Sequence, residues 1–583
     1  MIGAEYIAEF FRQRGSDKFF LVTGGACAFI VDAIARNPNT NYVCFQHEQA
    51  AAMAADSLWR VDRTVGVTVA TSGPGATNLI TGIACSYFDS IPTIHITGQV
   101  NQDESANFLG TSVRQAGFQE TNIVDMVKPI TKYAVQVKNG EELKIELEKA
   151  YNIAISDRKG PVLIDVPMNV QKEEVGNQIV YNVPIEEKLS DQEVQKISQQ
   201  IADLFKDSKR PAVLFGAGVG LAGSENEVVK WLKKNSSVPF VSSWNGMTYF
   251  NHDIKNYHGQ IGVYGNRGAN LLVQNCDALL VLGSRLDNRQ RSGNFKSFAP
   301  VAKVLVIDVD SEELKKYKIE GYQVAHTNLK YAKEVLSENV SSSREWVEYA
   351  INLKEEFFGK DVSEFSKKNN SLSPYLVVQK INKMISNDAV VIADTGASLC
   401  WVFQAFHKTN QAIYTAGGHS TMGYSFPAAI GAALSKSQKE VIAFIGDGGF
   451  QMNIQELQTA YFYKLNLKII ILNNGGYGII KQFQDLYFES RYEATGSGYS
   501  VPDFRKVVEA YGVKYFKVES LSDIAEEIFD YQGPAVIDVI LHQNTLIEPK
   551  LEMGRPIHDQ YPYLSEEKVR ALNPFNGFKR AKK

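Results

Sequence analysis

The stretch Val441-Ile442-Ala443-Phe444-Ile445-Gly446-Asp447-Gly448-Gly449-Phe450 decides the fold. Its apolar run predicts a buried strand, which is followed by a glycine-rich turn, a helical stretch and a second strand that ends in Asn473-Asn474. The 29 residues from Gly446 to Asn474 have the length of one βαβ unit. Because the carboxyl ends of neighbouring parallel strands lie side by side, we expect Asp447 and Asn474 to converge on one point.

The residue types at this point suit a magnesium ion that carries a phosphate group. The Asp447 carboxylate, the Asn474 side-chain carbonyl and a nearby backbone carbonyl are hard oxygen ligands, and such a site keeps positions open for phosphate oxygens. Gly448 and Gly449 let the backbone approach an anion, which the following helix N-terminus favours. The alternative is a tight glycine turn with a helix-capping aspartate. The paired asparagines at this spacing favour the diphosphate site.

Strand-like apolar runs alternate with helical stretches along the whole chain. This pattern is typical of βαβ units on parallel sheets. With 583 residues, the chain is long enough for about three or four domains. We predict an α/β protein of three doubly wound parallel-sheet domains, residues 1–175, 190–340 and 370–545, followed by an extended C-terminal tail, 546–583. Polar stretches at 176–192 and 341–371 suggest the boundaries.

The first and last thirds close with similar segments. One is Gly160-Pro161-Val162-Leu163-Ile164-Asp165-Val166, and the other is Gly533-Pro534-Ala535-Val536-Ile537-Asp538-Val539. Gly-Pro before a buried strand is common punctuation in α/β proteins. Two such endings in corresponding places favour a shared topology of the outer thirds.

The composition excludes several classes of protein. Lys and Arg number 61 against 65 Asp and Glu, so the net charge of −4 favours neither nucleic acid nor an anionic membrane as the main partner. The five cysteines are scattered without a CxxC pair, which argues against a zinc site or a disulfide framework. Residues 1–15 predict an amphipathic helix rather than a signal peptide, and no apolar run approaches a membrane span. We therefore expect a cytoplasmic protein.

From Gly446 to Asn474 the chain resembles thiamine diphosphate enzymes, whose cofactor motif runs from Gly-Asp-Gly to Asn-Asn over about this distance. The resemblance covers nearly the whole chain, and it is greatest to the acetolactate synthase-like branch. The other segments that carry it, in order, are Phe45-Gln46-His47-Glu48-Gln49-Ala50-Ala51, Thr71-Ser72-Gly73-Pro74-Gly75-Ala76-Thr77-Asn78, Asp89-Ser90-Ile91-Pro92, Ile96-Thr97-Gly98-Gln99, Phe118-Gln119-Glu120, Thr421-Met422-Gly423-Tyr424 and Pro427-Ala428-Ala429-Ile430-Gly431.

The resemblance implies a role for each domain and for particular residues. Residues 1–175 would bind the pyrimidine, 190–340 FAD or a similar nucleotide and 370–545 the diphosphate with Mg²⁺, and the tail 546–583 would lie over the active site. Glu48 would bond the aminopyrimidine ring, although locally it also fits a helix N-terminal carboxylate, and Met422 would wedge between the two cofactor rings. The remaining implied residues are Gly25, Phe118 and Gln119 at the catalytic centre, Asn78, Ser420, Gly448 and Gly449 on the cofactor, and Asp447, Asn474 and the Gly476 carbonyl on the metal.

The middle third has a weaker signal of its own. The strand Val213-Leu214-Phe215 runs into the glycine-rich turn Gly216-Ala217-Gly218, and many α/β loops look alike. By resemblance to the flavin-holding segments of acetolactate synthases, FAD would contact Arg158, Gly216, Gly218, Gly283, Arg285 and Asp308 in a structural role. Asn288 and Asn328 replace residues that are usually acidic there. The alternative is a vestigial domain that binds nothing.

The acceptor side favours carboligation. Keto-acid decarboxylases commonly use an adjacent His-His pair, and none of the nine histidines here is adjacent to another. Where acetolactate synthases usually carry Trp, this chain has Phe483, and His419-Ser420 replaces their Leu-Gly. His419 would either transfer a proton or point away from the cofactor. Arg289 matches the arginine that contacts the acceptor carboxylate, with pairing to Asp287 as the alternative.

We expect a carboligase that takes a two-carbon unit from pyruvate. The acceptor would be a second 2-keto acid or a nucleotide-linked keto-deoxysugar, because residues 473–478 and 557–564 look like relatives from polysaccharide pathways, including yersiniose formation. A decarboxylase or C–C hydrolase of the same superfamily and a non-catalytic nucleotide-binding scaffold are the alternatives. The resemblance implies at least a homodimer. It leaves open whether the assembly is a homotetramer and whether a regulatory subunit binds.

Overall fold

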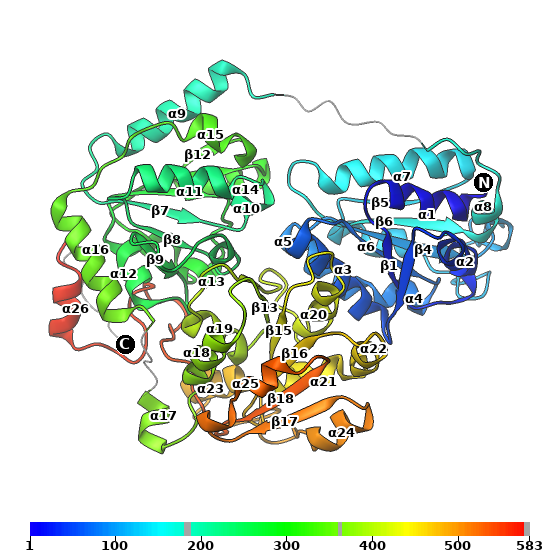
Figure 1. Cartoon of the computed structure of the whole chain (residues 1–583). Helices are drawn as coiled ribbons and strands as arrows, with labels where there is room; N and C mark the ends of the chain where they lie inside the picture. The colour runs from blue at the N-terminus through cyan, green and yellow to red at the C-terminus, as the bar shows by residue number, and fades with distance from the viewer. Residues whose placement is uncertain (180–187, 360–363, 576–583) are drawn as a thin grey trace.

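The computed structural model describes residues 1–179, 188–359 and 364–575. They form three α/β units, each built on a parallel six-stranded sheet (Figure 1). The predicted fold class is therefore confirmed. Parts of both predicted boundary stretches, 180–187 and 360–363, and the end of the tail, 576–583, lie outside the described residues.

The N-terminal sheet has the strand order β2-β1-β3-β4-β6-β5. Its central strands β3, β4 and β6 are buried along their whole length, as expected for a parallel sheet with both faces covered. The elements are β1 (Lys18–Leu21), β2 (Asn41–Cys44), β3 (Gly66–Ala70), β4 (Thr93–Gln99), β5 (Tyr133–Gln136) and β6 (Val162–Pro167), with α1 (Gly3–Gln13), α2 (Ala28–Arg36), α3 (Glu48–Asp62), α4 (Pro74–Asn78), α5 (Ile80–Asp89), α6 (Ile123–Val127), α7 (Gly140–Ile155) and α8 (Met168–Lys172).

The middle sheet runs β12-β11-β10-β7-β8-β9, which in chain order is the dinucleotide-binding arrangement 3-2-1-4-5-6 read from its other edge. The order reverses between β7 and β10. The elements are β7 (Pro211–Phe215), β8 (Phe240–Ser242), β9 (Tyr257–Gln260), β10 (Ala278–Leu282), β11 (Lys303–Asp308) and β12 (Gln323–His326), with α9 (Asp191–Phe205), α10 (Gly218–Leu221), α11 (Glu225–Lys234), α12 (Arg267–Asn275), α13 (Asn288–Arg291), α14 (Ser311–Ile319), α15 (Ala332–Val335) and α16 (Arg344–Phe357).

The C-terminal sheet runs β14-β13-β15-β16-β18-β17, the same relative order as the N-terminal sheet. The two Gly-Pro endings precede β6 and β18, which occupy equivalent places, so the predicted shared topology is confirmed. The elements are α17 (Glu364–Asn369), α18 (Pro374–Met384), β13 (Val390–Ala393), α19 (Ala397–Ala405), β14 (Ala412–Tyr414), α20 (Ser425–Ala433), β15 (Val441–Gly446), α21 (Asp447–Met452), α22 (Leu457–Phe462), β16 (Leu467–Asn473), α23 (Gly478–Tyr487), α24 (Phe504–Ala510), β17 (Lys514–Val518), α25 (Glu526–Asp530), β18 (Ala535–Ile540) and α26 (Glu566–Leu572).

The two outer units share one core, in which α3 packs against α20. The sequence of α3 is rich in alanine, so the two helix backbones come close. A Cβ on Gly431 of α20 would lie 2.2 Å from the Ala54 carbonyl oxygen, so only glycine fits there. The N-terminal and C-terminal units are therefore joined through the packing of α3 against α20.

The tail packs along the middle unit, where Leu551 donates its backbone N–H to Val263 and Asn270 of α12 donates to the Ile557 carbonyl, both at 2.9 Å. It includes a short helix, α26, whose first turn is capped by Ser565. Its predicted place over the active site stays a prediction.

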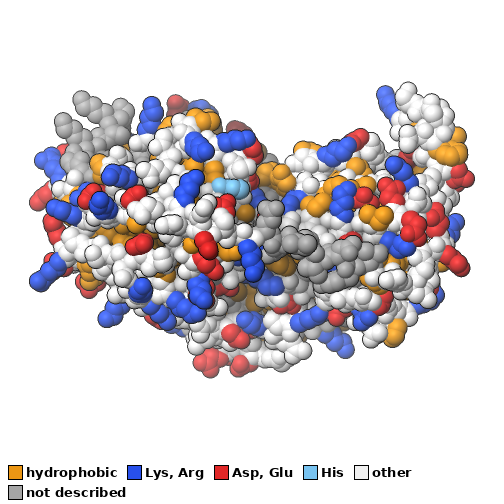
Figure 2. All heavy atoms as spheres, turned by 90° about the horizontal axis from the view of Figure 1, so that it is seen from above, with side chains coloured by type: hydrophobic (Ala, Val, Ile, Leu, Met, Phe, Trp, Pro, Cys, Tyr) orange, Lys and Arg blue, Asp and Glu red, His pale blue; other side chains and the backbone are white. Residues whose placement is uncertain are grey.

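Both signs of charge are interspersed over the face in Figure 2, in keeping with the near-neutral balance of the chain. In the described part of the chain, no helix combines the length and the apolar character that crossing a membrane requires.

Candidate functional site

The carboxyl edge of the C-terminal sheet brings together the three residues predicted to hold the metal. Strand β15 ends at Gly446, α21 begins at Asp447, and the neighbouring β16 ends at Asn473. One Asp447 carboxylate oxygen accepts the backbone N–H groups of Asn474 at 3.1 Å and Gly476 at 3.3 Å. The convergence expected from the sequence is therefore present, and the role as metal ligands stays a prediction.

The donor set at this edge fits a metal and a diphosphate. Asp447 and Asn474 are buried, and the Asn474 side-chain nitrogen has no hydrogen-bond partner among the described residues. Burial raises the pKa of Asp447, and hydrogen bonds from Tyr499 and three backbone N–H groups oppose that rise. A bound phosphate would give the buried Asn474 amide a hydrogen-bond acceptor, and a bound cation would stabilise the charged form of the buried Asp447 carboxylate.

Two tyrosines complete this edge, and the sequence did not indicate them. The Tyr499 hydroxyl donates to the second Asp447 carboxylate oxygen at 2.6 Å, and its ring packs against Tyr477 with centroids 4.3 Å apart. A Cβ on Gly448 would lie 2.4 Å from the Tyr477 ring, which shows why a glycine follows Asp447. Tyr499 comes from an irregular segment, so no periodicity or motif signals its place.

Glu48 begins α3 at the carboxyl edge of the N-terminal sheet. Its side chain is 7% exposed, and one carboxylate oxygen accepts the Asn78 side-chain N–H at 2.9 Å. The other oxygen would lie 3.2 Å from a Cβ on Gly75. Gly25 lies at the start of a 3-10 turn and has open space where a side chain would be. These residues place a carboxylate at a glycine-lined edge, and their role at the pyrimidine stays a prediction.

The segment between β14 and α20 carries His419, Ser420 and Met422. Ser420 has a φ of +59°, and its hydroxyl lies 2.5 Å from that of Thr395. The His419 ring stacks on Phe88 with centroids 5.3 Å apart. The His419 ring therefore packs against an aromatic side chain of α5. Among the described residues, no hydrogen bond of the His419 ring supports a role in proton transfer. Met422 is half-buried.

Phe118 and Gln119 lie on the loop between β4 and α6. The Phe118 side chain is 84% exposed, and Gln119 has a φ of +63°. Glu120 fastens the loop, because its carboxylate accepts the backbone N–H groups of Ala106 and Ala116. The hydrogen bonds of Glu120 stabilise the loop, and the exposed Phe118 side chain is available to contact another surface.

Among the described residues, the Glu48 and Asp447 carboxylates accept hydrogen bonds only from residues of their own units. The two halves of the predicted cofactor site are therefore built separately, at the carboxyl edges of two sheets with the same strand order.

A cavity of about 330 Å³ lies at the carboxyl ends of β7 and β10, where the strand order reverses. This volume is within the range of small-molecule sites. Gly216 follows β7 directly, and a Cβ there would lie 1.9 Å from the Gly283 carbonyl oxygen, so the two turns require glycine to pass each other. The lining includes most of the residues predicted to hold a flavin, namely Arg158, Gly218, Gly283, Arg285 and Asp308, together with Arg289 and Asn328.

Several charged groups at the cavity form ion pairs. Arg158 forms an ion pair with Asp310 and a second with Glu313 at 3.5 Å, which joins the N-terminal unit to the middle unit. Asp287 accepts the backbone N–H groups of α13 and lies 3.9 Å from Arg285. The Arg289 guanidinium therefore does not take the pairing with Asp287 that we considered, and it has no ion-pair partner in the described part of the chain.

Phe483 lies on α23, which follows the Asp447 site along the chain. Its side chain is 40% exposed, and its ring packs against Tyr487 with centroids 4.5 Å apart. It therefore presents an aromatic face at the surface of the C-terminal unit.

Comparisons with known proteins cover all three units. Descriptions of thiamine pyrophosphate enzymes, that is, thiamine diphosphate enzymes, match at residues 1–126 (N-terminal TPP binding domain), 198–337 (central domain) and 394–539 (C-terminal TPP binding domain). The acetolactate synthase large subunit of Lactococcus lactis is 31% identical over 95% of this chain and 94% of its own length. That of Corynebacterium glutamicum is 32% identical over 98% and 93%, and the isozyme 2 large subunit of Escherichia coli is 30% identical over 95% and 98%. The chain therefore belongs to the thiamine pyrophosphate enzymes, in their acetolactate synthase-like branch, and is a thiamine diphosphate-dependent enzyme of the transferase type.

Proposed function

We propose that this enzyme decarboxylates pyruvate and transfers the two-carbon unit to a second carbonyl compound. The observation that carries the proposal is the pair of built half-sites, with Glu48 at one sheet edge and Asp447 beside Asn474 at the other. A non-catalytic scaffold would have no need to keep both.

In this proposal, thiamine diphosphate would supply a nucleophilic carbon for the decarboxylation of the keto acid. Glu48 would bond the aminopyrimidine nitrogen and hold a proton there. Asp447, the Asn474 side chain and the Gly476 carbonyl would hold Mg²⁺ against the diphosphate. Met422 would fix the relative angle of the two rings, and Gly25 would leave the space that the reacting carbon needs.

The glutamate and the metal site would come from different subunits, so we propose a homodimer as the smallest active assembly. The separate hydrogen bonding of Glu48 and Asp447 within one chain supports this arrangement, and the exposed Phe118 would meet the partner chain. A homotetramer and a regulatory subunit are compatible with it. The relatives from Lactococcus lactis and Escherichia coli are named as large subunits.

The acceptor would be a 2-keto acid or a nucleotide-linked keto-deoxysugar. Phe483 gives a smaller ring without the N–H donor of a tryptophan, which would enlarge the acceptor pocket. Arg289, which has no ion-pair partner among the described residues and lines the cavity, would meet the acceptor carboxylate or a phosphate.

A comparison of acceptors tests this proposal. The enzyme would be incubated with thiamine diphosphate, Mg²⁺ and pyruvate, alone and with sugar nucleotides that carry a keto-deoxysugar. We expect acetolactate in the first case or a branched sugar nucleotide in the second. Stoichiometric acetaldehyde under both conditions would instead identify a decarboxylase. Cleavage of a 1,3-dicarbonyl compound, with no turnover of pyruvate, would identify a C–C hydrolase.

We further propose that the cavity of the middle unit holds FAD in a structural role. Its place at the strand-order reversal, with Gly216 and Gly218 at the β7 turn, supports this. Replacing Arg158 by Ala removes a cation from the cavity wall, so we expect the dissociation constant for FAD to rise at least about tenfold in a flavin fluorescence titration. Arg344→Ala, at an exposed arginine of α16, is the matched control. Equal affinities of the two variants and the wild-type protein would contradict the proposed site.

A further inference from the structure

The segment that carries His419, Ser420 and Met422 is held at both ends by buried carboxylates. At its far end, Asp394 accepts the backbone N–H groups of Gly423 at 3.0 Å and Ser425 at 2.9 Å. At its near end, Asp89 of α5 accepts those of Gly417 at 2.9 Å and Gly418 at 2.7 Å. Only residues 419–422 lie between the two anchors.

The two anchors differ in origin. Asp394 follows β13 in the same unit as the segment. Asp89 belongs to the N-terminal unit, and its bond to Gly417 joins positions 328 residues apart. A carboxylate that accepts two successive backbone N–H groups fixes both the position and the direction of a loop, because each bond is charge-assisted.

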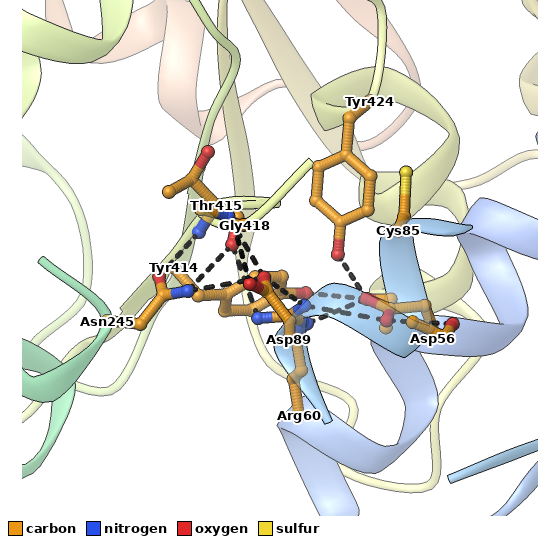
Figure 3. A network of polar contacts seen from close by, with 12 residues as sticks. Asp56, Arg60, Cys85, Asp89, Asn245, Tyr414, Thr415, Gly418 and Tyr424 are labelled. Carbon is orange, nitrogen blue, oxygen red and sulfur yellow. Dashed lines mark hydrogen bonds and ion pairs between the residues drawn. The ribbon is translucent and has the colours of Figure 1, made fainter. Parts of the chain in front are cut away.

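Asp89 is itself held in place by a buried arginine. Arg60 of α3 donates to Asp89 at 2.8 Å, to Asp56 at 2.6 Å and to the Thr415 carbonyl at 3.2 Å (Figure 3). The side chains of Arg60 and Asp89 are 7% and 6% exposed. Burial alone would lower the pKa of Arg60, but Asp56, Tyr424 and Asp89 outweigh it and keep the pKa well above its usual value, so the cation is permanent.

The middle unit reaches the same point through Asn245. Its side-chain N–H donates to the Thr415 carbonyl at 3.0 Å and to Asp89 at 3.4 Å, and its carbonyl accepts the Thr415 N–H at 3.1 Å (Figure 3). Asn245 lies at the start of a 3-10 helix, Asn245–Tyr249. Side chains of the N-terminal and middle units therefore meet the backbone of residues 415–418 of the C-terminal unit.

Phe88, the neighbour of Asp89 on α5, continues the contact along the segment. Its ring stacks on His419 at an interplanar angle of 10°. A Cβ on Gly418 would lie 2.7 Å from the Phe88 Cβ, so the segment passes close against α5. The end of α5 thus contacts each residue from Gly417 to His419.

We propose that Asp89 is a positioning residue for the segment that carries Ser420 and Met422. It holds the backbone N–H groups of Gly417 and Gly418 and thereby sets the position of Ser420 and Met422. Arg60 and Asn245 in turn hold Asp89 in place. The proposal rests on the proposed function of Met422 and Ser420 at the thiamine ring. It assigns to the N-terminal unit a second task besides Glu48, because α5 orients a segment of the C-terminal unit in the same chain. Four residues of this contact also line the cavity at the carboxyl ends of β7 and β10, namely Arg60, Asp89, Asn245 and Gly417.

The variant Asp89→Asn tests the proposal with little change in size. Asparagine offers one acceptor and one donor, so one of the two loop N–H groups loses its partner and the charge that strengthens both bonds is gone. We expect amide hydrogen exchange at residues 417–420 of the cofactor-free protein to become about 10- to 100-fold faster, with other segments unchanged. We also expect the dissociation constant for thiamine diphosphate with Mg²⁺ to rise at least about tenfold, and kcat to fall far more than KM for pyruvate rises.

Asp56→Asn is the matched control, because it removes a carboxylate from the same arginine and touches no N–H group of residues 417–420. We expect it to lower the thermal stability without the local exchange change. Asp89→Glu, which restores the charge, should recover part of the affinity. Should Asp89→Asn fail to fold, Asn245→Ala should speed exchange at Thr415 and Gly417 in its place.

Unchanged exchange at residues 417–420 in Asp89→Asn, or an equal rise in Asp56→Asn, would overturn the proposal. So would faster exchange with unchanged thiamine diphosphate affinity. Exchange and cofactor binding need neither pyruvate nor an acceptor, so an error in the proposed reaction would leave both readouts as they are and would appear only in the product assay.

Discussion

Replacing Glu48 by Gln is expected to lower turnover by about 10²- to 10⁴-fold, because the carboxyl group would hold the proton at the aminopyrimidine nitrogen. The fold should remain, since glutamine has the same length and its amide oxygen can still accept the Asn78 N–H. The measurement is the initial rate of CO₂ release from pyruvate with thiamine diphosphate and Mg²⁺ in excess, together with the midpoint of thermal unfolding.

The matched control for Glu48→Gln is Glu141→Gln. Glu141 is an exposed glutamate in the first turn of α7, so it shares with Glu48 the position of a helix N-terminal carboxylate and nothing else. We expect this control to react at the wild-type rate. If Glu48→Gln also reacts at the wild-type rate, Glu48 only stabilises its helix and its assigned role is wrong.

Asp447→Asn is expected to weaken thiamine diphosphate binding in the presence of Mg²⁺ by at least about 100-fold. The change removes the only carboxylate of the predicted ligand set and keeps its size. Calorimetric titration with thiamine diphosphate at several Mg²⁺ concentrations measures the effect, and the dependence of affinity on Mg²⁺ should disappear with it.

Asp503→Asn serves as control in the same unit, because Asp503 caps α24 through the Lys506 N–H and is not one of the predicted metal ligands. We expect its cofactor affinity to equal that of the wild-type protein. Asp447→Asn that binds thiamine diphosphate as tightly, with the same response to Mg²⁺, would show that the turn after β15 is only a capped glycine turn.

The sequence predicted the features that depend on short stretches of chain. The strand and turn from Val441 to Gly449 and the second strand to Asn474 lie within one βαβ unit, so their spacing alone placed Asp447 beside Asn474. The Gly-Pro endings likewise predicted the shared order of the outer sheets, because each marks the same strand. Local patterns specify local geometry, and the topology rules of parallel sheets extend it.

Contacts between distant segments could not be predicted in this way. Tyr499 reaches Asp447 from an irregular segment, and Asp89 reaches Gly417 from another unit. Asp89 stands in a segment that resembles the family, but one sequence does not show what its carboxylate accepts. The stacking of His419 on Phe88 depends on the packing of two units and has no signal in either segment.

The most direct test of the account is the balance of products from pyruvate. The enzyme, with thiamine diphosphate and Mg²⁺, would be given pyruvate with and without a nucleotide-linked keto-deoxysugar, and CO₂, acetaldehyde and the carboligation product would be counted. We predict that each CO₂ released is matched by one molecule of acetolactate or branched sugar nucleotide. One acetaldehyde for each CO₂, with no carboligation product under either condition, would contradict the account.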